Sequence, residues 1–230
     1  RRSKKSQAYD RIGSAKYERR ISERARNRLF LYTAFGRYGM EFSKQEKNYL
    51  LDIVRLVLTS CVGAGKKLEE LSFSAVPDPK LAEKCGAFVT YHIKNGSEKE
   101  LRGCIGHMEG IYPLWETVAR MAYSAAFHDT RFLPVEKKEL PFIDYEITVL
   151  TPFEPCEKIE DIELGTHGIL FECLGRRAVF LPQVPAEQGW DKTQTLEFLA
   201  LKAGLSKKKK KKSEAKFFVF RGIVLENGLE

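Results

Sequence analysis

The chain has 230 residues, of which 43% are hydrophobic and 30% charged, and this composition is typical of an ordinary globular protein. No run approaches the roughly 20 apolar residues that a membrane-spanning helix needs, so no membrane partner is expected. The formal net charge of +8 is uneven: residues 1–40 carry +9 and the rest −1, so the overall charge does not identify partners of the remaining chain.

Residues 1–42 are predicted to form a basic N-terminal extension. Such an extension is suited to binding RNA, DNA or anionic lipid. Basic tails are common, however, and this one has no recognisable binding motif, so a solvated leader is the favoured interpretation. Nucleic acid is therefore not expected as a partner, except through residues 1–40.

The folded body is predicted to begin near Ser43. Ser43 and Glu46 have the spacing of a capping box, in which each side chain accepts a hydrogen bond from an exposed amide. Apolar residues follow at helical spacing to about Thr59. The glycine-rich segment 63–66 then ends the helix, and its spacing excludes a phosphate-binding P-loop.

A strand is predicted over residues 86–93, and the Asn95-Gly96 turn indicates a hairpin into a second strand, Leu101 to Ile105. A helix is predicted from Pro113 to about Phe127. The alternating, β-branched segment from Asp144 to Leu150 predicts a third strand.

The second half of the chain begins with a tight turn, Gly165 to Gly168. The elements predicted after it are strands at Ile169–Cys173 and Ala178–Leu181, a helix at Thr195–Ala203 that ends at Gly204, and a final strand at Phe217–Leu225. The six lysines Lys207 to Lys212 are predicted to be a solvated loop, because like charges repel.

The order of elements is α-β-β-α-β followed by β-β-α-β. This order predicts a mixed α/β fold of the α+β class with mostly antiparallel sheet. We predict a larger α/β subdomain over residues 43–155 and a smaller one over residues 156–230.

The segment Leu101 to Gly106 contains most of the candidate chemistry. If it is extended, Arg102 and Cys104 point to one face, and a fixed positive charge beside a thiol favours the nucleophilic thiolate. The alternative, which the residues alone favour, is that Cys104 is a small buried apolar residue. Gly103 and Gly106 leave room for another backbone or a ligand to approach.

The cysteines do not indicate a disulfide framework. There are five of them, an odd number, and no CxxC pair occurs, so a reducing cytoplasm is expected. His107 follows Cys104 by three residues, but one such pair falls short of the four ligands of a closed zinc site. No metal site is therefore predicted.

His167, which is flanked by Thr166 and Gly168, is expected to be accessible. It could act as a base or simply brace its turn, and the sequence favours neither. Asp129 and Arg131 could orient a polar ligand or tie down a loop. Glu146, on a predicted strand, could be a base, although a structural role is favoured.

Trp190 could line a pocket, but packing is the favoured role because tryptophan buries much area.

Several segments together resemble the AMMECR1 domain family. They occur in the family's order over about residues 43–226 and comprise LRGCIG at 101–106, AAFHDTRF at 125–132, GTHGI at 165–169, AVFLPQV at 178–184 and EQGWD at 187–191. The resemblance implies a larger and a smaller α/β subdomain with a cleft between them. In that arrangement the LRGCIG segment and the His167 turn would come from opposite walls.

The resemblance implies no defined reaction and leaves the cofactor unknown. Prokaryotic members of the family resemble one component of a three-part set with a Memo-like protein and a radical-SAM protein, which suggests a shared pathway.

Two functions are therefore expected. The first is an enzyme acting on a small polar or anionic substrate in the cleft, with Cys104 as nucleophile, Arg102 as charge stabiliser, His167 as base, and Asp129 and Arg131 as substrate-positioning residues. The second is a non-catalytic module that docks a protein or peptide in the same cleft.

Overall fold

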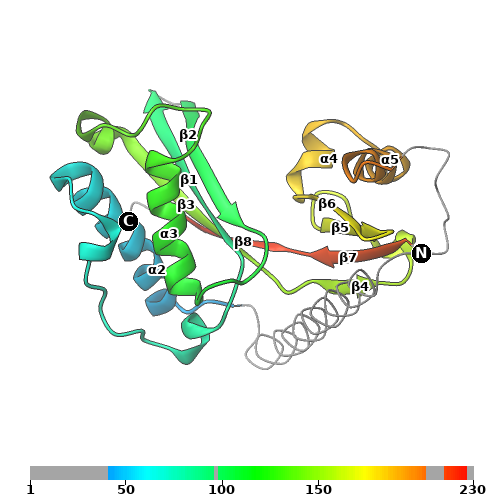
Figure 1. The fold of residues 1–230 in the computed structure, drawn as a ribbon, viewed down its shortest axis with the longest axis horizontal. Helices are drawn as coiled ribbons and strands as arrows, with labels where there is room; N and C mark the ends of the chain where they lie inside the picture. Colours follow the sequence, from blue (N-terminus) through cyan, green and yellow to red (C-terminus); the bar gives the residue numbers. More distant parts are fainter. Residues whose placement is uncertain (1–40, 96–97, 206–214, 227–230) are drawn as a thin grey trace, which may run out of the picture. The chain divides into compact units, whose positions relative to one another are not determined.

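The computed structural model describes residues 41–95, 98–205 and 215–226 (Figure 1). The chain divides into two units, Arg1–Met40 and Glu41–Glu230, and every described residue belongs to the second. The basic extension and the lysine run Lys207 to Lys212 lie outside the described residues, and so does Gly96 of the predicted turn.

Helix α2 (Lys44–Val57) begins at the predicted capping box. The Ser43 hydroxyl accepts from the Glu46 amide at 3.3 Å, and the Glu46 carboxylate accepts from the Ser43 amide at 2.6 Å. Its buried side includes Leu50 and Val54, so the wide apolar face that was predicted is the packed one. The helix ends in a π-helical turn, η1 (Leu58–Val62), slightly beyond the predicted end.

The capping carboxylate also has a buried cationic partner. Lys80, in the short helix η3 (Pro79–Ala82), lies 2.9 Å from Glu46, and both residues are under 10% exposed. The ammonium group also donates to the Glu41 carbonyl at 2.7 Å and stands over the Phe42 ring. Burial acts to raise the pKa of Glu46, but hydrogen bonds from Lys80 and Ser43 outweigh it, so the pKa is lowered.

A first antiparallel sheet has the strand order β2-β1-β3-β8. Its strands are β1 (Ala87–Asn95), β2 (Glu98–His107), β3 (Ile143–Leu150) and β8 (Gly222–Glu226). Helices α2 and α3 (Leu114–Phe127) pack on one face of it (Figure 1). The predicted β1–β2 hairpin is confirmed, because Asn95 pairs with Glu98 and Ala87 with His107.

Alternate residues of the first sheet point toward and away from these helices. Tyr91, Ile147 and Leu225 are buried beneath the helices, and the Tyr91 hydroxyl donates to the Ala122 carbonyl of α3 at 2.9 Å. The residues between them point to the opposite face, which we call the far face. It carries, from strand to strand, Cys104, Thr90, Glu146 and Glu226.

A second antiparallel sheet has the order β4-β7-β5-β6. Its strands are β4 (Glu154–Cys156), β7 (Lys216–Phe220), β5 (Gly168–Cys173) and β6 (Arg176–Phe180). Helix α5 (Lys192–Lys202) buries Leu199 and Ala200 in a core with Ile169 and Phe171. The mixed α/β class with antiparallel sheets is therefore confirmed.

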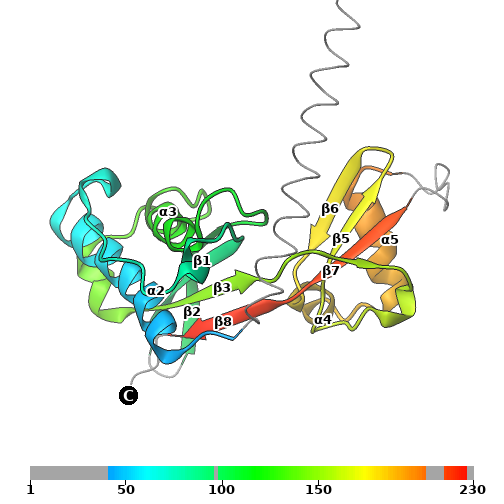
Figure 2. The same cartoon turned by 90° about the horizontal axis from the view of Figure 1, so that it is seen from below.

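The C-terminal segment differs from the prediction. One strand was expected over Phe217–Leu225, but the chain forms β7 and β8, which lie in different sheets (Figure 2). Between them, the Arg221 carbonyl accepts from the Thr151 amide at 2.8 Å, and the Arg221 amide donates to the Thr151 hydroxyl at 2.8 Å. In the sequence, the strands of the second sheet thus lie between β3 and β8 of the first sheet. The chain therefore passes from the first sheet to the second near residue 155 and returns to the first sheet after residue 220.

Several short elements were not predicted, among them a strand and a helix. Strand β4 has only three residues, and helix α4 (Gln183–Glu187) contains Pro185. The five cysteines are all free. Within the described ranges, no helix has the length and apolar character needed to cross a membrane.

Candidate functional site

The LRGCIG segment lies on β2, an edge strand of the first sheet, and its glycines are in contact with other parts of the chain. A Cβ atom added at Gly103 would lie 2.5 Å from the Ala125 carbonyl oxygen of α3. One added at Gly106 would lie 2.2 Å from the Phe88 ring. The close approach predicted for these glycines is thus made by a backbone and a ring of this chain, and ligand binding by them stays a prediction.

Arg102 lies in a β-bulge, because Gly103 pairs with Tyr91 while Leu101 pairs with His92. The bulge interrupts the alternation on which the expected pairing of Arg102 with the thiol depended. The guanidinium instead donates to the Glu139 carboxylate at 2.7 and 3.0 Å.

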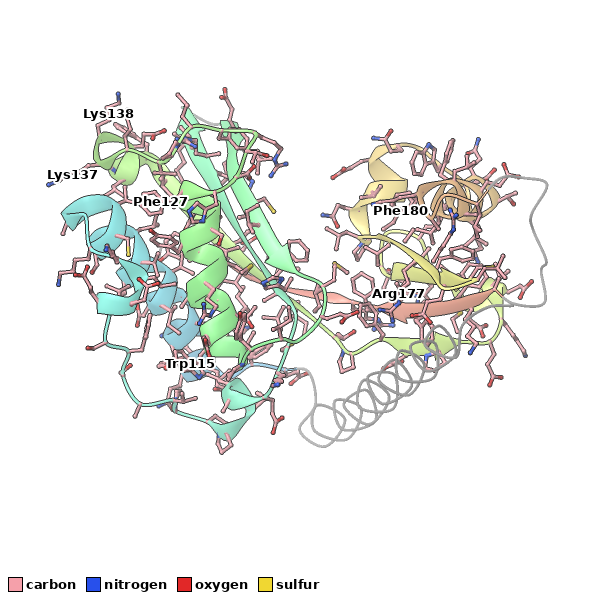
Figure 3. The ribbon with its side chains drawn as sticks, viewed as in Figure 1. Trp115, Phe127, Lys137, Lys138, Arg177 and Phe180 are labelled. Carbon is pink, nitrogen blue, oxygen red and sulfur yellow. The ribbon has the colours of Figure 1, made fainter. Side chains whose placement is uncertain are left out.

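Glu139 belongs to the short helix η4 (Lys137–Phe142), and Lys137 and Lys138 are labelled at its start in Figure 3. The hydrogen bonds from Arg102 lower the pKa of the Glu139 carboxyl, against the effect of its burial. Arg102 therefore fastens η4 to β2, and its predicted role as charge stabiliser is left without support from these contacts.

The main chain of Cys104 is held by an ion pair at the edge of the sheet. Its amide donates to the Asp129 carboxylate at 2.8 Å, and its carbonyl accepts from Arg131 at 3.1 Å. Arg131 also donates to both oxygens of Asp129, at 2.9 and 2.7 Å. Because an edge strand leaves such groups unpaired, this pair takes the place of a neighbouring strand at Cys104. Asp129 and Arg131 thus tie a loop to β2, as one of the two predictions had it.

The ion pair between Asp129 and Arg131 shifts the pKa of both residues. Asp129 is only 5% exposed. Its hydrogen bonds from Arg131 in the first place, and from the Cys104 amide, hold the pKa of the carboxyl well below its usual range despite burial. Conversely, the hydrogen bonds to Asp129 raise the pKa of Arg131. Since its guanidinium also donates to the Cys104 carbonyl, Arg131 is a cationic neighbour of the Cys104 main chain.

Phe132 joins the two arginines. Its ring centroid lies 5.9 Å from the guanidinium carbon of Arg102 and 5.5 Å from that of Arg131. These distances suit cation–π contacts, which stabilise each pair by about 0.5–1 kcal/mol at partly exposed sites. The segments 101–106 and 128–132 are thus one structural unit rather than two separate motifs.

The Cys104 thiol is half-buried on the far face. The Thr90 hydroxyl donates to its sulfur at 3.4 Å. Thr90 lies directly opposite both Cys104 on β2 and Glu146 on β3, so thiol, hydroxyl and carboxylate follow one another across three strands. Glu146, a candidate base for which a structural role was favoured, is thereby placed in the row of the thiol.

His167 contacts its own turn and one arginine. Its Nδ1 accepts from the Glu163 amide at 3.1 Å, and its Nε2 lies 3.3 Å from a guanidinium nitrogen of Arg221. Among the described residues these are its hydrogen-bond partners, and Cys104 is not one of them. The geometry agrees with a histidine that braces its turn, and its role as base stays a prediction.

Trp190 packs on aromatic residues of its own half of the chain. Its ring lies 5.5 Å from that of Phe180, which is labelled in Figure 3, and stacks on Phe198 at 4.4 Å. His107 contacts the Tyr112 ring at 6.3 Å. No group of three or more histidine, cysteine or acidic side chains in the described part of the chain is placed to hold a metal ion.

Sequence reasoning missed Thr90, Glu139 and Phe132. Nothing in the pattern singles out Thr90, because its importance comes from the register of β1 with β2. Phe132 follows Arg131 in the motif and could have been proposed as a cation–π partner, but Glu139 carries no such local signal.

Replacing Asp129 with asparagine is expected to lower the free energy of unfolding at neutral pH by about 2–3 kcal/mol, because charged hydrogen bonds are lost. The pKa of Asp129 is lower in the folded state. Its contribution is therefore present above the ordinary carboxyl pKa of about 4 and is lost as the pH falls further. Urea unfolding of both proteins should show their difference shrinking below about pH 4. A difference that is the same at low pH would contradict this account.

Known proteins resemble this chain over most of its length. A family model described as AMMECR1 matches residues 51–225. Protein MK0488 of Methanopyrus kandleri is 38% identical over 195 residues, which are 82% of this chain and 91% of that protein. A protein of Aquifex aeolicus is 42% identical over 152 residues, covering 64% of this chain and 77% of its own length.

A solved structure has a similar fold. The crystal structure of the uncharacterized protein PH0010 from Pyrococcus horikoshii is 31% identical, with a TM-score of 0.65, and the match covers 80% of this chain and 92% of that one. The family match and the 38% identity to the Methanopyrus protein both extend over strands of the two sheets. The chain belongs to the AMMECR1 family.

Proposed function

We propose that this chain is an enzyme that acts on a small polar substrate at the far face of the first sheet, with the Cys104 thiol as its nucleophile. The observation that carries the proposal is the contrast between the two parts of Cys104. Its main chain is fixed on one side of β2 by Asp129 and Arg131, whereas its thiol is half-buried and lies in a row with other polar groups. A rigidly held reactive group is what catalysis requires.

The row supplies complementary chemistry. The Thr90 hydroxyl can donate or accept a hydrogen bond, and the Glu146 carboxylate can accept one. A thiolate at Cys104 would form a C–S bond with an electrophilic carbon of the substrate. The leaving group would depart with the bonding electron pair and take up a proton equivalent to the one that the thiol released.

The family resemblance adds two parts to the proposal. One is a cleft whose second wall carries the His167 turn, with His167 as the base. The other is a pathway shared with Memo-like and radical-SAM proteins, in which a small product or substrate would pass between the components.

Residue-resolved alkylation of the native protein tests the nucleophile. Brief exposure to iodoacetamide at neutral pH, followed by mass spectrometry, should label Cys104 at least about tenfold faster than Cys156. Cys156 is a matched control because it is also half-buried, while burial and the charge of Asp161 raise its pKa. Cys85 should stay unlabelled, since burial raises its pKa to about 12.

Labelling of Cys104 that is no faster than that of Cys156 would remove the nucleophile and with it the enzyme. The second candidate function, a module that docks a protein or peptide, would then take its place. Two exposed apolar residues favour it: Leu101, the first residue of the LRGCIG segment, is 42% exposed, and Leu133, which directly follows the 125–132 segment, is 84% exposed. A Leu133→Ser variant that no longer retains a partner of the wild-type protein would support this second function.

A further inference from the structure

We infer that Arg131 and Asp129 position the Cys104 thiol and set its readiness to ionise, with Arg131 supplying the cation that stabilises the thiolate. The inference rests on the proposed function only in taking this thiol as the reacting group. It replaces Arg102, the cation that the sequence placed beside Cys104, by another arginine.

The contacts of the two arginines separate their roles. Arg131 reaches Cys104 itself, 3.1 Å from the carbonyl oxygen, and is held there by two hydrogen bonds to Asp129. The hydrogen bonds of Arg102 are instead accepted by Glu139 of η4 and by the Pro134 carbonyl, which precedes that helix. The arginine that contacts Cys104 is therefore Arg131.

Asp129 has two functions in this arrangement. Its carboxylate accepts a hydrogen bond from the Cys104 amide at 2.8 Å, which fixes the strand. It also orients the planar guanidinium of Arg131, which donates to both carboxylate oxygens. At the same time its negative charge opposes formation of a thiolate nearby. The main chain of Cys104 thus contacts a cation and an anion, whose charges act on a thiolate with opposite signs.

Other polar groups of the described part of the chain lie on the same face as the thiol. The Thr90 hydroxyl on β1 donates to the sulfur, and Glu146 on β3 lies beyond it in the same row. His92 lies two residues from Thr90 on the same face of β1 and pairs with Asp144 of β3. None of these is a cation bonded to Cys104, so Arg131 has no substitute among them.

Because Arg131 and Asp129 carry opposite charges, removing each charge should shift the pH midpoint of Cys104 alkylation in opposite directions. If the two residues only supported the structure, the shifts would not differ in sign. In Arg131→Met the carboxylate is left alone beside the thiol, and the pH midpoint of Cys104 alkylation should rise by about 1 unit. In Asp129→Asn, which keeps an acceptor oxygen for the Cys104 amide, the cation is left and the midpoint should fall by about 1 unit. Arg131→Lys, which keeps the charge without the planar fork, should lie between Arg131→Met and wild type.

Arg102→Met is the matched control. It removes an arginine that is also ion-paired and lies on β2, the strand of Cys104. Its midpoint should equal that of the wild type. Circular dichroism should confirm that each variant is folded at the temperature of the experiment. The midpoint is also read from thiolate ultraviolet absorbance, as the difference between each protein and its Cys104→Ser partner, so that a slowly alkylating thiol still gives a result.

The outcomes are distinct. Shifts of opposite sign in Arg131→Met and Asp129→Asn support the inference. Shifts of the same sign, no shift in either variant, or a shift in Arg102→Met alone would overturn it. A thiol that titrates as described but alkylates no faster than Cys156 would overturn the proposed enzyme while leaving the electrostatic inference in place.

Discussion

Lys80→Met is expected to lower the free energy of unfolding by about 3–5 kcal/mol, since removing one partner of a buried ion pair leaves the other charge uncompensated. The Glu46 carboxylate is only 5% exposed and would lose the ammonium 2.9 Å away. The Glu41 carbonyl would lose a donor as well. Methionine keeps most of the aliphatic volume, so the loss reports on charge rather than on packing.

Urea unfolding followed by circular dichroism measures this effect. Lys138→Met is the control: Lys138 also forms an ion pair, with Glu136, but the two side chains are 80% and 60% exposed. Solvent screens such a pair, so this variant should unfold as the wild type does. If the two variants lost similar stability, the burial of Glu46 and Lys80 would not be the cause.

Gly103→Ala is the second substitution with a large expected effect. The new Cβ would lie 2.5 Å from the Ala125 carbonyl oxygen, and neither group can turn away because both belong to backbone in regular structure. Either β2 or α3 must move, which costs about 1–3 kcal/mol or more in a well-packed core. Since the shift would also move Cys104, the rate of its alkylation should change along with the midpoint of thermal unfolding.

Gly63→Ala provides the comparison. Gly63 follows η1 in a right-handed helical conformation, and an added Cβ would meet the Leu140 side chain at 3.4 Å and the Leu58 carbonyl oxygen at 3.8 Å. Alanine there should leave stability unchanged or raise it by up to about 1 kcal/mol. A Gly103→Ala protein as stable as Gly63→Ala would mean that β2 and α3 can separate freely.

Much of the fold could be predicted from the sequence because helix caps, apolar spacing and turns are encoded in short segments. The capping box at Ser43, the buried stripe of α3 and the β1–β2 hairpin all follow from residues close together in sequence. Strand β4 could not be found this way. Its three residues are too few to show alternation, and the strand exists because Glu154 pairs with Val219 far along the chain.

The site was predicted in its residue types but not in its connections. Cys104, Asp129 and Arg131 were all proposed from the sequence, yet the bond between the Asp129 carboxylate and the Cys104 amide joins a side chain to a backbone group. Side-chain patterns carry no information about such a bond. The bulge at Arg102 likewise depends on the register between two strands, and a strand pattern alone assumes strict alternation.

The division of the first sheet along the chain has a consequence for synthesis. Its edge strand β8 is translated after every other strand, whereas β1, β2 and β3 leave the ribosome before the whole second sheet. Until then β3 presents an unpaired edge, which is a site for wrong pairing between nascent chains. The first sheet therefore remains open throughout the translation of residues 154–220, and a chaperone that shields β3 during this interval would protect the nascent chain from aggregation.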